Sequence, residues 1–219
     1  VLWVEESYVD IQNAVIASGD YGIRLDDSAG SVTSSTIDTT CNGIDVNNKK
    51  TAGNNVAYKL TVANNKITTD ERSPLTAFNL AWVDFTNNVI DGASDGSGIQ
   101  ISKSQVTVSG GSIGPIGGWN GLWVYGQSDV SAENNTILNT AKEPVLIGEY
   151  HHKDQGWNVP APTKARIYFA NNLVSNNTGT CNSDYMYGGD FPCPAFHVYM
   201  SSATFIDNTV TNNIGDGFR

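Results

Sequence analysis

Apolar residues recur along this chain in an eight-residue pattern that reads apolar-x-apolar-x-Asn-Asn-x-apolar. The clearest copies are 83–90, 130–137, 167–174 and 60–67. Weaker copies keep most of the apolar positions but replace one or both asparagines, at 9–16, 30–37, 106–113 and 203–210. One unit repeated every few tens of residues is typical of a solenoid, in which each repeat forms one coil.

The last apolar residues of the eight copies fall at 16, 37, 67, 90, 113, 137, 174 and 210. The shortest steps suit one coil of a parallel β-helix, and the longer ones indicate the same coil with an insertion. A short apolar-x-apolar segment lies between successive copies. It occurs at 23–25, 44–46, 78–80, 99–101, 122–124, 145–147 and 196–198. Period-two alternation predicts strands whose flanking residues point inward and whose middle residue points outward.

The asparagine pair stands between two strand-like stretches, where the chain must bend. Asparagine tolerates left-handed backbone angles and bonds its own chain, so it suits a sharp turn. If the coils stack, the second asparagines should form a hydrogen-bonded ladder, interrupted at Ser35 and Gly111. The expected rungs are Asn65, Asn88, Asn135, Asn172 and Asn208. The alternative is that the pairs mark ordinary turns without a ladder.

With this repeat, the chain resembles the right-handed parallel β-helix proteins of the pectate-lyase-like superfamily, over essentially all 219 residues. The resemblance implies an all-β, single-stranded right-handed parallel β-helix of about eight coils, forming one domain from 1 to 219. It matches no particular enzyme family. The paired Asp and Gly-His-Gly motifs of polygalacturonases are missing. Also missing are the late-coil Asp cluster of calcium-dependent pectate lyases and the Asp-Pro-His of alginate epimerases.

Composition narrows the classes of partner. The net charge of −10 argues against nucleic acid and against anionic membranes, because both require a basic surface. No stretch is long and apolar enough to span a bilayer, and no signal peptide is present. Solenoids normally carry polar caps, and we see none in the sequence. We therefore interpret the chain as a piece of a longer protein or as a subunit that associates end to end.

The cysteines and glycosylation motifs favour an extracellular or cell-surface location. Cys181 and Cys193 lie in one insertion, where a disulfide would contribute about 3 kcal/mol. Cys41 then remains as a buried thiol or pairs with a segment outside the chain. Of two N-glycosylation motifs, at Asn134 and Asn176, we expect Asn176 to be the better acceptor because it lies in a loop.

Three insertions, 47–58, 148–164 and 175–194, locate the candidate working face, since solenoid loops concentrate on the binding side. The last two should wall a cleft over the later coils. Its expected floor consists of the outward residues Arg24, Asp45, Asn79, Gln100, Trp123, Leu146 and His197, and two residues further on Tyr125, Tyr199 and, in coil four, Ala81. The candidate sugar-stacking residues are Trp123, Tyr125, Tyr199, Trp157 and Tyr150. The alternatives are that the loops bury these rings or that the rings form a protein interface.

The candidate catalytic residues are His197, His152, Asp154, Lys164 and Arg166. A polysaccharide lyase needs a base and a cation, which His197 with Lys164 or Arg166 could supply. A glycosidase needs two carboxylates, which Asp154 could supply with Glu149, Asp184 or Asp190. His151 or His152 could bind a metal with His197, and Asp26-Asp27 or 91–95 could bind calcium. Solvated loops and turn chemistry explain these stretches more simply, so we expect no cofactor.

These observations favour an extracellular structural or assembly β-helix with a carbohydrate-binding face on its later coils. The alternative is a polysaccharide lyase, epimerase or glycoside hydrolase that acts between the 148–164 and 175–194 loops.

Overall fold

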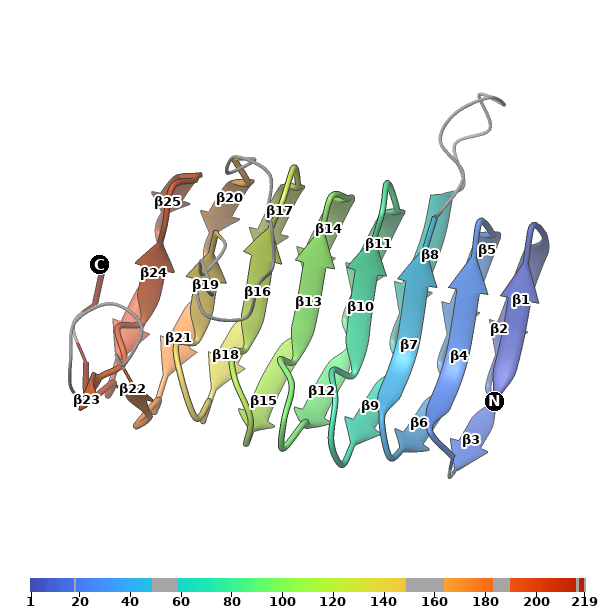
Figure 1. Cartoon of the computed structure of the whole chain (residues 1–219), viewed down its shortest axis with the longest axis horizontal. Coiled ribbons are helices and arrows are strands. Elements are labelled where there is room, and N and C mark those ends of the chain that lie inside the picture. Colours follow the sequence, from blue (N-terminus) through green and yellow to red (C-terminus); the bar gives the residue numbers. More distant parts are fainter. Residues whose placement is uncertain (18, 49–58, 149–163, 183–189, 216, 219) are drawn as a thin grey trace, which may run out of the picture.

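A computed structural model describes residues 1–17, 19–48, 59–148, 164–182, 190–215 and 217–218 of the chain. Within these ranges the strands form three parallel sheets of eight strands each and one two-stranded hairpin (Figure 1). Sheet A contains β1 (Leu2–Glu5), β4 (Tyr21–Asp26), β7 (Asn42–Asn47), β10 (Leu75–Phe78), β13 (Ile99–Ser102), β16 (Leu122–Tyr125), β19 (Val145–Ile147) and β24 (Phe196–Val198). Sheet B contains β2 (Tyr8–Gln12), β5 (Ala29–Thr33), β8 (Lys59–Ala63), β11 (Trp82–Thr86), β14 (Gln105–Ser109), β17 (Asp129–Glu133), β20 (Arg166–Ala170) and β25 (Ser202–Ile206). Sheet C contains β3 (Val15–Ala17), β6 (Thr36–Thr39), β9 (Lys66–Thr69), β12 (Val89–Gly92), β15 (Ser112–Ile116), β18 (Thr136–Leu138), β21 (Leu173–Ser175) and β26 (Thr209–Thr211).

Each coil contributes one strand to each sheet, so the eight coils predicted from the repeat are confirmed. Figure 1 shows the coils side by side from the N-terminal to the C-terminal end, with sheet A facing the viewer. Identical positions of successive coils pair in register, as Ile23 does with Ile44 and Leu75 with Ile99. The inward residues of coils two to seven are buried in one continuous apolar core. The hairpin, β22 (Thr180–Asn182) with β23 (Asp190–Pro192), lies in the last insertion.

The predicted inward strand at 78–80 is wrong. The strand of the fourth coil is β10, in which Leu75 and Ala77 are buried and Thr76 takes the outward register beside Gln100. Asn79 and Leu80 instead have φ of 54° and 71° in the turn that follows, and Leu80 is exposed. Two apolar-x-apolar segments compete here, and the residue before the strand distinguishes them.

A glycine or proline occupies that preceding corner in several coils, as Gly98 does before β13 and Pro144 before β19. Pro74 holds the same corner before Leu75, and this signal identifies the correct strand. The expected outward position of Ala81 is also wrong, because Ala81 is buried between sheets A and B and Phe78 pairs with Ser102.

The asparagine ladder is confirmed. The Asn172 side-chain oxygen accepts hydrogen bonds from the backbone and side-chain nitrogens of Asn135, at 2.8 and 3.0 Å, and its side-chain nitrogen donates to the Ala132 carbonyl at 2.8 Å. Asn88 accepts from Asn65 in the same way, and Asn208 accepts from Asn172. Each buried amide therefore joins two coils and satisfies backbone groups at a bend where no strand pairing is available.

Ser35 does not interrupt the ladder, contrary to expectation. Its backbone nitrogen donates to the Asn65 side-chain oxygen at 2.9 Å, and its hydroxyl oxygen accepts from the Ala14 nitrogen at 3.0 Å. A serine hydroxyl thus takes the acceptor role of the amide at this level of the stack.

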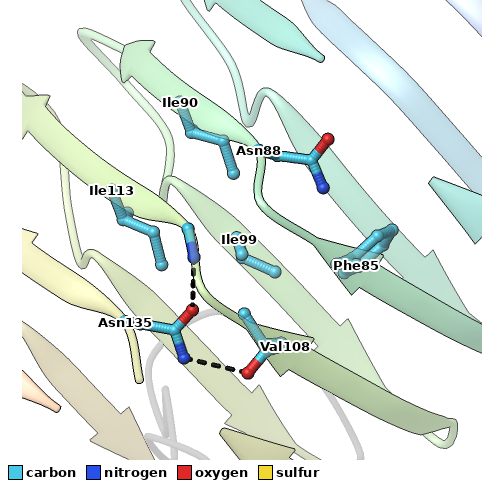
Figure 2. A pocket seen from close by; sticks show the side chains of 8 residues that line it. Phe85, Asn88, Ile90, Ile99, Val108, Ile113 and Asn135 are labelled. Atoms are coloured by element: carbon cyan, nitrogen blue, oxygen red, sulfur yellow. Dashed lines mark hydrogen bonds between the residues drawn. The ribbon is translucent and has the colours of Figure 1, made fainter. Parts of the chain in front are cut away.

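Gly111 does interrupt the ladder. Its nitrogen donates to the Asn135 side-chain oxygen at 3.1 Å, but it has no side chain to accept from Asn88 in the coil before (Figure 2). A cavity of about 10 Å³ lies there, lined by Asn88, Gly111, Asn135 and apolar residues such as Phe85 and Ile113. The missing rung therefore leaves a small void inside the core between coils four and five.

A second, shorter ladder was not predicted. The Asn177 side-chain oxygen accepts from the Thr140 nitrogen at 2.8 Å, and the Asn213 side-chain oxygen accepts from the Asn177 side-chain nitrogen at 2.7 Å. The two glycosylation motifs consequently have the same local geometry. Asn134 and Asn176 are both exposed, with φ of 57° and 58°, and each directly precedes a buried rung. Their surroundings differ, because Asn134 lies in the two-residue turn between β17 and β18 and Asn176 lies in the longer stretch between β21 and β22. Asn176 therefore stays the predicted acceptor.

We predict that Asn172→Ala lowers the free energy of unfolding by about 2–3 kcal/mol, because it leaves buried backbone groups of neighbouring coils unsatisfied. Chemical denaturation would measure the loss. Asn171→Gly is the matched control, since Asn171 is exposed with φ of 55°, a conformation that glycine adopts without strain. Its effect should stay within about 0.5 kcal/mol. Equal stability of the Asn172→Ala variant would show that the ladder contributes little.

Candidate functional site

The outward row of sheet A runs the length of the stack. Register places the following residues in one line: Trp3, Arg24, Asp45, Thr76, Gln100, Trp123, Leu146 and His197. The row changes character along its length. Its early coils carry an ion-paired cluster, its middle coils carry aromatic rings, and Leu146 and His197 at its far end are buried.

The early cluster is centred on Arg24. Its Nε lies 3.1 Å from Asp26 Oδ2 and its Nη1 lies 3.9 Å from Asp45 Oδ2, while the Trp3 ring lies 5.5 Å from the guanidinium. Burial by itself would lower the pKa of the Arg24 guanidinium, but the hydrogen bond and charge of Asp26, together with the charge of Asp45, raise it. Thr76 donates a hydrogen bond to Asp45. Arg24 thus offsets part of the negative charge of Asp26 and Asp45.

The middle of the row carries a stack of three rings, which we call the aromatic column: Trp119, Trp123 and Tyr125. Trp119 lies in the turn that leads into β16, and the other two alternate on the outward side of β16. The Trp119 and Trp123 ring centroids are 5.9 Å apart at 23°, and those of Trp123 and Tyr125 are 4.5 Å apart at 29°. The rings therefore stand beside one another and face one another, instead of lying flat on the sheet.

The polar atoms of the aromatic column also have partners. Trp119 Nε1 donates to Asp95 Oδ1 at 3.1 Å, Trp123 Nε1 donates to the Gly148 carbonyl at 3.1 Å, and Gln100 Nε2 donates to the Tyr125 hydroxyl at 3.0 Å. Lys142 Nζ lies 4.8 Å from the centroid of the Trp119 ring. All three residues are nevertheless only partly buried.

The far end of the row holds a buried carboxylate that sequence reasoning missed. Glu143 is 2% exposed in the turn before β19, and one of its carboxylate oxygens, Oε1, lies 3.3 Å from His197 Nδ1. Asn120 Nδ2 donates to the other oxygen, Oε2, at 3.2 Å and to the Glu143 carbonyl at 3.0 Å. Glu143 thus joins the turns and strands of three successive coils. A single acidic residue next to the corner Pro144 gave no motif that could have predicted this.

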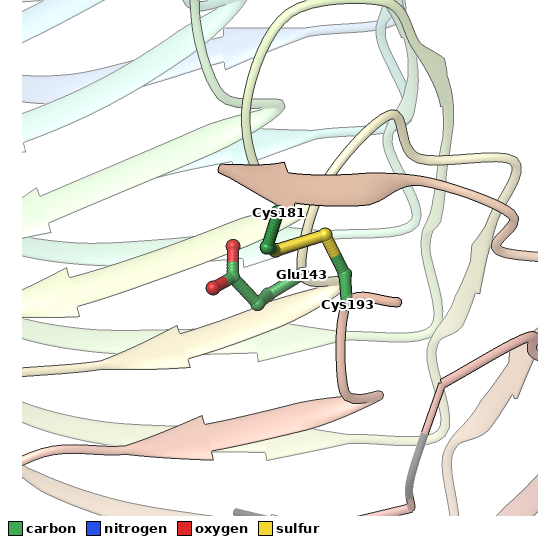
Figure 3. A group of neighbouring side chains, drawn as sticks. All are labelled: Glu143, Cys181 and Cys193. Carbon is green, nitrogen blue, oxygen red and sulfur yellow. A yellow bond between two sulfur atoms is a disulfide. The ribbon is translucent and has the colours of Figure 1, made fainter. Parts of the chain in front are cut away.

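The disulfide predicted between Cys181 and Cys193 is confirmed, with a Cα–Cα distance of 5.0 Å. It closes the β22–β23 hairpin over the last coils, and both residues are buried. Among the described residues, Glu143 and the two cysteines form a group whose possible ligand atoms lie within 4.8 Å of one another (Figure 3). As long as the sulfur atoms are joined, they have no thiolate to offer a metal.

The predicted catalytic residues do not form one site within the described part of the chain. Arg166 lies on β20 in sheet B, where its Nη2 is 2.8 Å from Asp129 Oδ2, whereas His197 lies on β24 in sheet A. Lys164 is exposed just before β20. His151, His152, Asp154, Glu149 and Asp184 lie outside the described residues, as do Tyr150 and Trp157. Tyr199 is described and is partly buried, in the turn after β24.

Cys41, the remaining cysteine, is a free thiol at intermediate burial. Its Sγ lies 3.7 Å from Glu71 Oε2. Partial burial raises the pKa of the Cys41 thiol, and the negative charges of Glu71 and Asp20 raise it further. The group is therefore a weakly ionised thiol and not an activated nucleophile.

The stacked coils and the asparagine ladder define the chain as a parallel β-helix protein. The family model described as a right-handed β-helix region matches residues 53–219. The chain therefore belongs to the right-handed β-helix family, in agreement with the resemblance seen in its repeat. No curated protein and no solved structure matches the chain. No helix among the described residues is long and apolar enough to cross a membrane.

We predict that Cys41 is alkylated more slowly at pH 8 than a small free thiol, whose pKa is about 8.5. A raised pKa leaves a smaller fraction of reactive thiolate at any pH below it. Glu71→Gln should accelerate the reaction, because it removes one of the charges that raise the pKa. Mass spectrometry of the native oxidised protein would follow the reaction. A rate equal to that of the free thiol would contradict the raised pKa.

Proposed function

We propose that this chain is a structural β-helix of an extracellular or cell-surface protein. The observation that carries the proposal is that the conspicuous outward side chains of sheet A are engaged with one another. Arg24 pairs with Asp26 and Asp45, the rings of the aromatic column stack on each other, and His197 lies against Glu143. A buried disulfide supports the location, since such bonds persist in oxidising compartments.

The burial of His197 weighs against the enzymatic alternative. A general base must reach the proton that it removes, within hydrogen-bond distance or through one water. The His197 side chain is 8% exposed, and Arg166, one of the two cations suggested as its partner, is salt-bridged on a different sheet. Catalysis by the residues of the 149–163 segment remains a prediction from the sequence.

The partial exposure of the aromatic column supports a second function, contact with a carbohydrate. A sugar stacks on the free face of an aromatic ring, but the faces inside the column are taken by neighbouring rings. We therefore infer that a glycan would contact the exposed ring edges and the ends of the column. The net charge of −10 favours a neutral glycan over a uronate polymer, because like charges repel.

Incubation with neutral and uronic-acid polysaccharides tests both functions, provided that retention and the release of new chain ends are both measured. We predict retention of a neutral polysaccharide without cleavage. Trp123→Ala should weaken retention about tenfold, corresponding to about 1.4 kcal/mol. Trp82→Ala is the matched control, since Trp82 is an exposed tryptophan on sheet B, beside Lys59.

Cleavage of any member of the panel would overturn the structural proposal and make the chain an enzyme. Absence of both retention and cleavage would leave the structural function and remove the carbohydrate contact. Equal loss in the two tryptophan variants would show that retention is not specific to the aromatic column.

End-to-end association of chains also remains a proposal. Parallel strands at the end of a stack offer unpaired backbone groups to a second copy. We predict rods longer than one chain, which is roughly 35–40 Å for eight coils at about 4.8 Å per coil. Negative-stain images at high protein concentration would reveal them, and uniformly single-chain particles would argue against association.

A further inference from the structure

The disulfide and the buried carboxylate beside it have a second possible chemistry. Glu143, Cys181 and Cys193 are 2%, 5% and 4% exposed, and their possible ligand atoms lie within 4.8 Å of one another. Figure 3 shows the Glu143 carboxylate beside the sulfur atoms, beneath the hairpin strand that carries Cys181. Two sulfurs and a carboxylate, gathered in a buried pocket, are a donor set suited to a thiophilic divalent cation.

Reduction is what would turn this cluster into a ligand set. A thiol reductant cleaves the S–S bond by thiol–disulfide exchange. Two reductant thiols are oxidised and form a disulfide with each other, and Cys181 and Cys193 each gain one electron and one proton. Binding of a divalent cation then displaces both protons and leaves two thiolates bound to it. The reduction therefore needs only these two thiols as co-reactant.

The dimensions fit a tetrahedral site. Zinc binds thiolate at about 2.3 Å and carboxylate oxygen at about 2.0–2.2 Å, so ligand atoms around it stand roughly 3.5–3.8 Å apart. The present group, all within 4.8 Å, needs only a small contraction together with opening of the S–S bond. Three protein ligands leave the fourth position to water.

The carboxylate is already held in place by neighbours of the kind found around metal ligands. Asn120 Nδ2 donates to one Glu143 oxygen at 3.2 Å, and His197 Nδ1 lies 3.3 Å from the other. Such outer contacts fix the orientation of a ligating carboxylate and are typical of protein metal sites. His197 is thus a positioning residue in this arrangement.

Electrostatics favour the cation once the disulfide is open. Two thiolates and a carboxylate, buried together, are costly because each negative charge loses hydration and repels the others. A divalent cation offsets most of that charge. Since it binds only the reduced form, it also shifts the equilibrium toward reduction.

We propose that Cys181, Cys193 and Glu143 form a redox-gated site for a thiophilic divalent cation such as Zn²⁺. The cluster is a disulfide crosslink under oxidising conditions and a metal crosslink under reducing ones. The disulfide closes the hairpin on itself, whereas the metal would also tie the hairpin to Glu143 in the turn before β19. This site is independent of the carbohydrate contact on the aromatic column.

The test uses the full chain with Cys41→Ser, which removes the third thiol. After reduction by a phosphine, Co²⁺ is added as a spectroscopic probe for Zn²⁺. We expect one Co²⁺ per chain, with a thiolate-to-cobalt charge-transfer band that Zn²⁺ abolishes. The oxidised protein should show no such band. Glu143→Gln, which retains the size of the side chain, should weaken cobalt binding at least tenfold.

If reduction partly unfolds the protein, circular dichroism provides a second measurement, the β-sheet signal. In that case Zn²⁺ should restore the β signal in the Cys41→Ser chain but not in its Glu143→Gln variant. A reduced chain without the charge-transfer band would overturn the proposal. Cobalt binding that is equally tight in the Glu143→Gln variant would also overturn it, because it would reveal an ordinary dithiol with no part for the carboxylate.

Discussion

The buried asparagine amide at the bend between sheets B and C is the interaction on which the rest of this molecule depends. Strand pairing joins the coils within each sheet, but the bends would leave backbone groups buried without partners. One amide resolves this by accepting from the coil before it and donating to a carbonyl of that coil, as Asn172 does with Asn135 and Ala132. That fixed bend helps to hold the register in all three sheets.

Register in turn positions everything on the outward face of sheet A. Equivalent residues of successive coils lie one above another. Each outward side chain therefore contacts the side chain at the same position of the next coil. The Arg24 cluster and the contact between Glu143 and His197 are both products of this stacking. On such a surface the polar and charged side chains are paired with one another. This suits a scaffold better than a catalyst, whose reactive groups must be available to a substrate.

The repeat predicted the coils and the ladder because their residues recur at fixed places, and the disulfide could be predicted because Cys181 and Cys193 lie close together in one insertion. It failed at the fourth coil, where 75–77 and 78–80 both alternate correctly and only the corner at Pro74 decides between them. The carbohydrate-stacking interpretation requires ring faces that are open to a sugar. Alternation gives the side on which Trp123 and Tyr125 emerge, but the rotation of each ring depends on packing against Trp119 and is invisible in the sequence. Glu143 was missed for a related reason, since its partners come from two other coils.

The missing rung at Gly111 lies at the interface between coils four and five. In a solenoid, stability is approximately a sum of terms between nearest-neighbour repeats, so cooperativity is only as strong as the weakest interface. Coils four and five are paired in all three sheets but lack the rung that joins coils three and four. The interface between coils four and five therefore has one amide rung fewer and a small cavity beside it, and we expect thermal opening or mechanical tension to act there first.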